Sequence, residues 1–135
     1  MLPHNLTREV RPMNYDVNVK DNNVVMLLMD GARALVHDSG KEFREVRNAE
    51  GSSEENINYH EYTHLKAKAM LKSLRYTYAR NRAVEAKRYT EDTPVGRADL
   101  AVHAADTAKA KAEYAFAVVV AGEAMEAWRE SYRNK

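Results

Sequence analysis

Hydrophobic positions recur with a helical period near the start of the chain. Apolar residues follow one another at three- and four-residue steps over 24–36, and Asp21 or Asn22 is placed to cap a helix in front of them. The Asp-Ser-Gly sequence at 38–40 is expected to break this helix, which we therefore place at 22–37. Its first half is apolar on every side, so we expect it to be buried.

Two long segments without internal helix breakers follow. The first, 53–89, contains neither Gly nor Pro, and at its start Ser52 and Glu55 have the spacing of a capping box. The second, 97–133, is rich in alanine and follows a proline-containing turn at 90–96. Two helices of similar length around a short turn are expected to fold back as an antiparallel hairpin.

This pattern predicts an all-α protein with one helical domain at 21–135. Residues 1–20 carry two of the three prolines, so we expect an N-terminal arm there, extended where Tyr15, Val17 and Val19 alternate with polar residues. The expected seam of the last helix runs through Leu100, Ala104, Thr107, Ala108, Ala115, Val118, Val119, Gly122 and Met125.

One hairpin and one short helix leave little surface to cover the apolar segments 24–29 and 114–121. Self-association would cover both segments, and we expect a homo-oligomer with a coiled-coil-like hairpin. The alternative is a monomeric three-helix bundle in which the first helix packs over 114–121.

Composition excludes several classes of protein. The 135 residues include no Cys, which excludes a disulfide scaffold, a Cys-ligated zinc site and a thiol nucleophile. No apolar run approaches the roughly 20 residues of a membrane span, and no export signal is visible. We therefore expect a cytoplasmic protein with no membrane partner.

One local motif matches a metal-binding pattern. His60, Glu61 and His64 form HExxH, in which two imidazoles one helical turn apart bind zinc and the glutamate activates water. The hairpin would bring Glu123 or Glu126 opposite the motif as a third ligand. In a chain of this composition HExxH occurs by chance about as often as it marks a metalloprotease. We therefore interpret the two histidines as hydrogen-bonded residues of the hairpin seam. We expect no metal, no cofactor and no catalysis.

The strongest functional signal is the distribution of charge. Eight Lys and Arg face a single acid, Glu85, over 64–89, although the net charge of the whole chain is only +1. Basic side chains pair with phosphates, and tyrosines among them can stack on unpaired bases, which indicates a single-stranded nucleic-acid site. The alternative is a basic helix that is merely solvated or that docks on the acids of a neighbouring subunit. The expected binding residues are Lys66, Lys68, Lys72, Arg75, Tyr76, Arg80, Arg82, Lys87 and Arg88.

The basic helix and the helix after it resemble the small phage recombination mediators of the UvsY type. The stretches that carry the resemblance are EYTHLKAKAMLKSLRYTYARNRAVEAKRYTEDTP and ADTAKAKAEYAFAVVVAGEAMEAWRES, within about residues 55–131. It implies a ring-like, non-enzymatic homo-oligomer that binds single-stranded DNA and helps to load a recombinase onto strands coated by a single-strand-binding protein. The oligomer contacts that it implies are Phe116, Val119, Met125 and Trp128.

Two other functions remain open at this point. One is a phage structural component or an inhibitor that acts through protein–protein contacts of the arm and the hairpin. The other is a metal-binding protein or metallohydrolase built on His60, Glu61 and His64.

Overall fold

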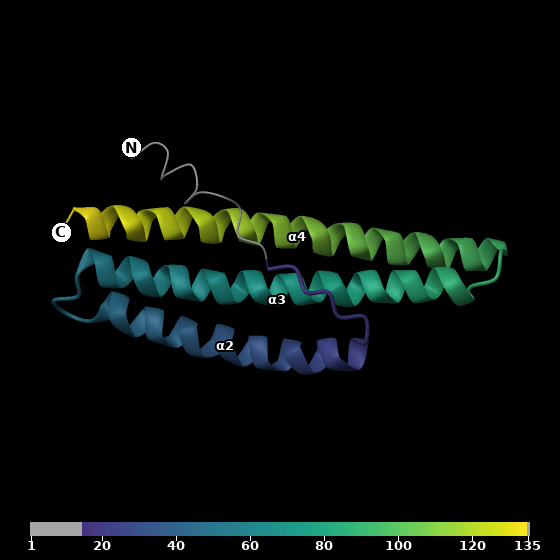
Figure 1. Ribbon diagram of the computed structural model, residues 1–135, viewed down its shortest axis with the longest axis horizontal. Coiled ribbons are helices and arrows are strands. Elements are labelled where there is room, and N and C mark those ends of the chain that lie inside the picture. The colour runs from purple at the N-terminus through teal and green to yellow at the C-terminus, as the bar shows by residue number, and fades with distance from the viewer. Residues whose placement is uncertain (1–14, 135) are drawn as a thin grey trace.

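The computed structural model describes residues 15–134, and these form three helices joined by short loops (Figure 1). Helix α2 spans Asn22–Asn48, α3 spans Glu54–Tyr89 and α4 spans Pro94–Arg133. Each helix runs antiparallel to the next, and α3 and α4 form the long hairpin. The prediction of an all-helical chain that contains a long antiparallel hairpin is thus confirmed.

The first helix continues well beyond its expected end. Our prediction of an end at residue 37 is wrong, because α2 runs through the Asp-Ser-Gly sequence without a break. Ser39 and Gly40 are buried against α3, and a Cβ atom at Gly40 would lie only 2.9 Å from the ring of His64. The glycine therefore allows a close approach between two helices instead of forming a turn.

Side-chain oxygen atoms cap the first two helices. Asp21 accepts a hydrogen bond from the second amide of α2, as predicted. At the start of α3 the cap is Ser53, whose hydroxyl accepts from the amide of Asn56 at 3.1 Å. The N-cap is therefore Ser53 and not the predicted Ser52, and the residue three positions after it is Asn56 instead of the glutamate of a capping box.

The last helix begins earlier than expected. Thr93 caps it by accepting from the amide of Gly96 at 3.0 Å, and Pro94 is its first residue. We placed this start at residue 97 because proline ends helices. In the first turn, however, the missing amide of proline has no helical partner to lose, so Pro94 begins the helix instead.

The three helices lie side by side in one layer instead of surrounding a common core (Figure 1). Helix α3 packs against both neighbours, whereas within residues 15–134 no Cα atom of α2 lies within 8 Å of α4. The alternative of a bundle with the first helix over 114–121 is therefore wrong, because that helix packs on α3. Within residues 15–134, the segment before α2 packs on one broad face of the layer, and no other described segment covers the opposite face.

The apolar core is small and lies between α2 and α3. Its buried side chains are Val25, Met29, Ala32, Leu71 and Leu74. The hairpin contact uses small residues instead, and Ala69 of α3 and Ala121 of α4 are both 0% exposed. Small side chains let the two long helices approach closely over their length.

The buried side of α4 differs in part from the predicted seam. Ala104, Ala115 and Val119 are exposed, whereas Ala121 and Ala124 are buried. Alanine occurs on every side of this helix, so the hydrophobic pattern does not fix which side faces α3.

We expect Ala121→Leu to destabilise the fold by about 1–3 kcal/mol, because added methyl groups at a fully buried position force the two helices apart. Ala115→Leu adds the same atoms at an exposed position of the same helix and should change the free energy of unfolding by less than about 0.5 kcal/mol. Urea denaturation followed by circular dichroism measures both. Equal effects would contradict the observed orientation of α4.

Residues 15–20 form an extended segment that runs along α3. Its odd-numbered side chains are half-buried and its even-numbered ones exposed, and Val17 and Val19 pack against the core. The predicted extended arm is confirmed for this segment, and the rest of the arm, 1–14, lies outside the described residues.

Polar side chains of α3 hold this segment by its backbone carbonyl groups. The hydrogen-bonded pairs are Ser73 with Tyr15, Thr77 with Val17 and Asn81 with Val19. Donors four residues apart on a helix are separated by about 6 Å along its axis. Two residues of extended chain span about 6.6 Å, so every second carbonyl meets a donor.

Candidate nucleic-acid interface

The basic side chains of α3 project from different sides of the helical layer. Nine residues turn an α-helix through about two and a half turns, so Lys68 points away from Thr77, where the segment 15–20 is bound. Lys68, Arg75 and Arg82 follow one another at seven-residue steps and are all exposed. They form a row on the side of the layer opposite the bound segment, which we call the bare face.

Two adjoining hollows on the bare face share Lys68. The first has a volume of about 580 Å³ and lies between α3 and α4, where Lys72 and Phe116 also line it. The Phe116 ring is 71% exposed, and most of the other lining side chains are apolar. The second, about 340 Å³, lies between α2 and α3 and adds Arg44 and Arg47. Lysines of α3 thus lie beside an exposed aromatic ring, and Lys68 connects them to the arginines of α2.

Acidic groups offset only part of this charge. The Glu113 carboxylate lies 3.6 Å from the Lys72 ammonium group, so Lys72 is already paired within the chain. Glu61 lines the second hollow. The Arg82 guanidinium lies 5.8 Å from the centre of the Tyr78 ring, which holds this cation by an interaction with the ring face.

Arg44 and Arg47 were not among the predicted binding residues. We ended the first helix at residue 37, so these arginines had no place on any helix face. Arg44 follows Gly40 by four residues, so in a continuous helix Gly40 and Arg44 lie on the same side of α2, the side that meets α3. This four-residue step is the signal that could have located the arginines.

Two of the predicted binding residues are occupied by contacts within the chain. Arg80 donates a hydrogen bond to the carbonyl of Val17 at 3.4 Å, and its guanidinium lies 5.1 Å from the centre of the Tyr76 ring. The Tyr76 ring in turn stacks on Tyr114, with ring centres 6.2 Å apart. These contacts occupy Arg80 and Tyr76 within the chain, so we leave both out of the interface.

Three further predicted cations, Lys66, Lys87 and Arg88, are exposed but lie off the bare face. At about 100° per residue, each projects more than a quarter turn away from the row of Lys68 and Arg75. They are nevertheless on the same helix, which makes them matched controls for the row.

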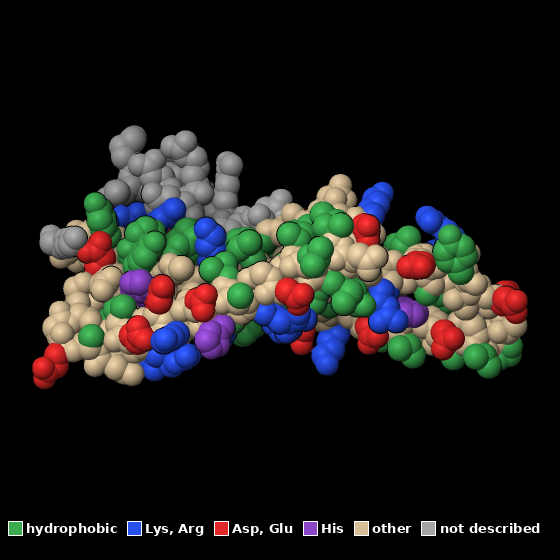
Figure 2. Space-filling model, turned by 90° about the horizontal axis from the view of Figure 1, so that it is seen from below, with side chains coloured by type: hydrophobic (Ala, Val, Ile, Leu, Met, Phe, Trp, Pro, Cys, Tyr) green, Lys and Arg blue, Asp and Glu red, His purple; other side chains and the backbone are tan. Residues whose placement is uncertain are grey.

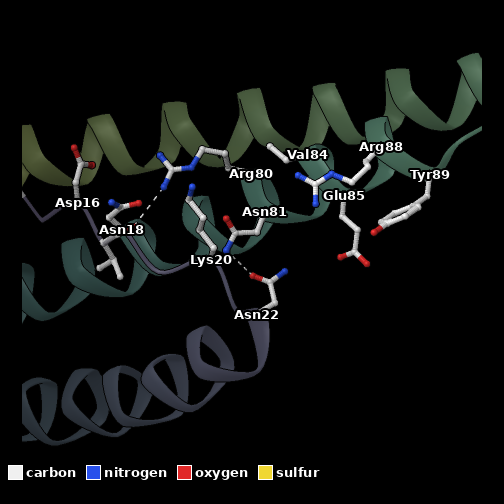
Figure 3. Close-up of a pocket in the computed structure, with 11 residues that line it drawn as sticks. Asp16, Asn18, Lys20, Asn22, Arg80, Asn81, Val84, Glu85, Arg88 and Tyr89 are labelled. Atoms are coloured by element: carbon white, nitrogen blue, oxygen red, sulfur yellow. Dashed lines mark hydrogen bonds between the residues drawn. The ribbon is translucent and has the colours of Figure 1, made fainter.

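A third hollow opens where the segment 15–20 meets the C-terminal half of α3 (Figure 3). Its volume is about 630 Å³, and the charged residues around it are Asp16, Lys20, Arg80, Glu85 and Arg88. Asn81 crosses it to reach the carbonyl of Val19 at 2.8 Å and the side chain of Asn22 at 2.9 Å. Nearly balanced charge and donors that already hold the backbone make this a structural junction.

The residues of the predicted metal site do not come together. His64 Nδ1 lies 3.1 Å from the Ser39 hydroxyl, and the ring stacks on Phe43 on the α2 side of α3. Glu123 and Glu126 belong to α4, on the other side of α3. Over the described part of the chain, no three His, Asp or Glu side chains form a metal-binding group. His64 is hydrogen-bonded as expected, but it faces α2 instead of the hairpin seam. The second histidine, His60, packs edge-on against the Tyr59 ring.

The side chains predicted at an oligomer contact differ in exposure. Phe116 and Val119 are 71% and 58% exposed and are open to a partner. Met125 is only 7% exposed, so its placement at an oligomer contact is corrected to the interior of the chain. Trp128 stacks on Tyr62 with ring centres 5.9 Å apart and thereby joins α4 to α3.

The environment of His64 opposes its protonation. Burial lowers the pKa of His64 below its ordinary value of 6.5, and the positive charges of Lys68 and Arg44 lower it further, against a smaller opposing effect of a hydrogen bond with the Val36 backbone. The neutral imidazole is therefore the form that the folded protein favours.

Lowering the pH from about 7.5 to about 5.5 should therefore reduce the free energy of unfolding, because His64 binds a proton more readily in the unfolded chain than in the folded one. His64→Gln should remove part of this loss, whereas His37→Gln, at an exposed position of α2, should leave it in place. Urea midpoints at the two pH values measure the difference. An unchanged pH dependence in His64→Gln would contradict the assignment.

No protein-family model, curated protein or solved structure matches this chain. Among the described helices, none combines the length and apolar character that crossing a membrane requires. The site above is therefore defined by the geometry of the chain's own residues.

Proposed function

We propose that this protein binds single-stranded nucleic acid on the bare face, without catalysis, as a homo-oligomer. The observation that carries the proposal is the row of Lys68, Arg75 and Arg82 beside the hollow that contains Phe116. Successive members of the row are about 10.5 Å apart along α3, so the row is about 21 Å long.

The row suits the backbone of a nucleic acid. Lysine and arginine side chains that pair with phosphates release condensed counterions, and this release supplies most of the affinity in binding without sequence preference. The cations contributed by Arg44 and Arg47 extend the row towards the C-terminal end of α2. Several phosphates would therefore be neutralised along one face.

The hollow beside the row favours a single strand over a duplex. Phe116 presents an exposed ring beside Lys68 and Lys72, above a mostly apolar lining. An unpaired base can lay its face on such a ring, with a gain of about 1–3 kcal/mol. In a duplex the bases are stacked on one another, so only the phosphates could be bound.

The resemblance to UvsY-type mediators suggests the setting of this activity. We infer a role in phage-like recombination or replication, with a recombinase or a single-strand-binding protein as a further partner. Arms of other copies or other helices of the oligomer would then surround the bound strand.

A protein partner is the second candidate, favoured by one observation. The apolar lining of the hollow at Phe116 would also accept a hydrophobic side chain of another protein. In that case the protein would be a structural component or an inhibitor, and the surrounding cations would pair with acids of the partner.

A titration of the purified protein against a fluorescent single-stranded oligonucleotide at several salt concentrations tests the proposal. The expected result is binding that weakens steeply with salt and exceeds binding to a duplex of equal length. Absence of binding at low salt would overturn it and favour the protein partner.

A further inference from the structure

The outer side of α2 carries an apolar stripe. Val24, Leu27, Leu28 and Leu35 are 42%, 71%, 44% and 46% exposed, and they follow one another at steps of one to seven residues along one side of the helix. Of the described helices, only α3 packs on α2, and it covers a different side. Figure 2, which views the molecule from the α2 side, shows hydrophobic side chains that reach the surface between charged ones.

Two leucines of the stripe are placed symmetrically around Gly31, whereas the position that mirrors Val24 is Asp38. Leu27 and Leu35 lie four residues before and after it, and Leu28 and Ala34 lie three residues before and after it. A Cβ atom at Gly31 would meet nothing within 4 Å, so the space outside this glycine is open. A helix that lacks a side chain at the centre of its apolar stripe allows another helix to approach closely there.

We propose that α2 pairs with α2 of a second copy of this chain, antiparallel, around a two-fold axis at Gly31. In this register Leu27 of each copy faces Leu35 of the other, so the contact between these two leucines occurs twice in the dimer. This inference deepens the self-association in the proposed function and rests on that part alone, since it needs no nucleic acid.

Charge opposes a parallel arrangement. Asp38 and Glu42 follow the stripe on α2, and both are exposed. A parallel pair would place Asp38 against Asp38 and Glu42 against Glu42, and such like-charge neighbours are destabilising. An antiparallel pair places the acids of the two copies at opposite ends.

The exposed apolar residues of α4 form a weaker rival interface. Phe116 lies in a hollow beside Lys68 and Lys72, where a second copy of the same surface would bring like charges together. Val119 is 58% exposed and lies one turn from Phe116, but the other positions one turn away on its apolar side are Ala115 and Gly122. The α2 stripe has four large aliphatic side chains within 12 residues.

Sedimentation equilibrium tests the pairing with three proteins. The wild type should show twice the chain mass of 15.4 kDa, and Leu27→Asp should show the chain mass with unchanged helix content. Phe116→Asp, a matched change at an equally exposed position, should remain dimeric. A dimer that survives Leu27→Asp but is lost in Phe116→Asp would overturn the proposal.

Disulfide trapping tests the orientation, because the chain has no Cys. Oxidation of Gly31→Cys should link two copies, whereas Asn48→Cys, at the C-terminal end of α2, should not be linked. Linked Asn48→Cys chains would contradict the antiparallel register.

The failure of the pairing can be distinguished from failure of nucleic-acid binding. A wild type that stays monomeric at all concentrations would overturn the α2 pair and with it the self-association. Oligonucleotide binding is measured separately with the Leu27→Asp monomer. Each monomer should still bind through its own bare face, but with lower avidity than the dimer.

Discussion

Oligonucleotide binding is expected to weaken about a hundredfold at low salt when the row of cations on the bare face is neutralised. The triple variant for this test combines Lys68→Gln, Arg75→Gln and Arg82→Gln. Each lost phosphate contact should also reduce the slope of the logarithm of the binding constant against the logarithm of the salt concentration. For a single strand the reduction is about 0.7 for each contact, or about 2 for the three contacts together. The side chains are exposed, so helix content and the free energy of unfolding should change little. Fluorescence anisotropy over a range of salt concentrations measures both effects.

A second triple variant provides the control for this experiment. Lys66→Gln, Lys87→Gln and Arg88→Gln remove the same charge from the same helix, but from other sides of it. We expect this variant to retain most of the affinity. Equal losses in the two variants would show that overall charge, and not the bare face, determines binding.

Leu74→Ala is expected to cost about 2–5 kcal/mol of the free energy of unfolding, the largest effect on stability of any single change considered. Leu74 is 5% exposed in a core that contains few large side chains, so few neighbours can move in to fill the cavity. Because a domain has only about 5–15 kcal/mol in total, this variant should unfold at much lower urea concentration.

The matched control for the core is Val84→Ala on the same helix. Val84 is 54% exposed, and its truncation should change the free energy of unfolding by less than about 0.5 kcal/mol. Urea denaturation followed by circular dichroism compares the two. If Leu74→Ala were no worse than the control, the core would not lie between α2 and α3.

The helices themselves were predictable because their signals are local. The Gly- and Pro-free stretch from residue 54 to 89 and its termination before Pro94 follow directly from backbone chemistry. The extent of α2 was not predictable in this way. Ser39 and Gly40 break a helix only when nothing packs on them, and here His64 of α3 fills the space beside Gly40.

The arrangement of the helices in one layer could not be read from the sequence. The alanines of α4 leave its buried side undetermined, and contacts such as the stack of Trp128 on Tyr62 join residues far apart in the chain. Hydrophobic periodicity identifies an amphipathic side, but it does not say which neighbour covers that side.

The basic character of α3 was predictable, but not the roles of its individual cations. Whether a cation is available depends on where the segment 15–20 lies, and that segment binds Arg80 while leaving Arg75 and Arg82 exposed. In the same way HExxH is a sequence match whose histidine His64 turns towards Ser39 of α2. Both outcomes are set by tertiary contacts.

Photo-crosslinking tests most directly whether nucleic acid lies on the bare face. A single-stranded oligonucleotide that contains a halogenated pyrimidine is irradiated with the protein, and the linked peptides are identified by mass spectrometry. The predicted result is a crosslink to Phe116, whose exposed ring borders Lys68 and Lys72. Crosslinks confined to Tyr89, at the hollow beside the segment 15–20, or no crosslink under conditions where the oligonucleotide binds, would contradict this placement.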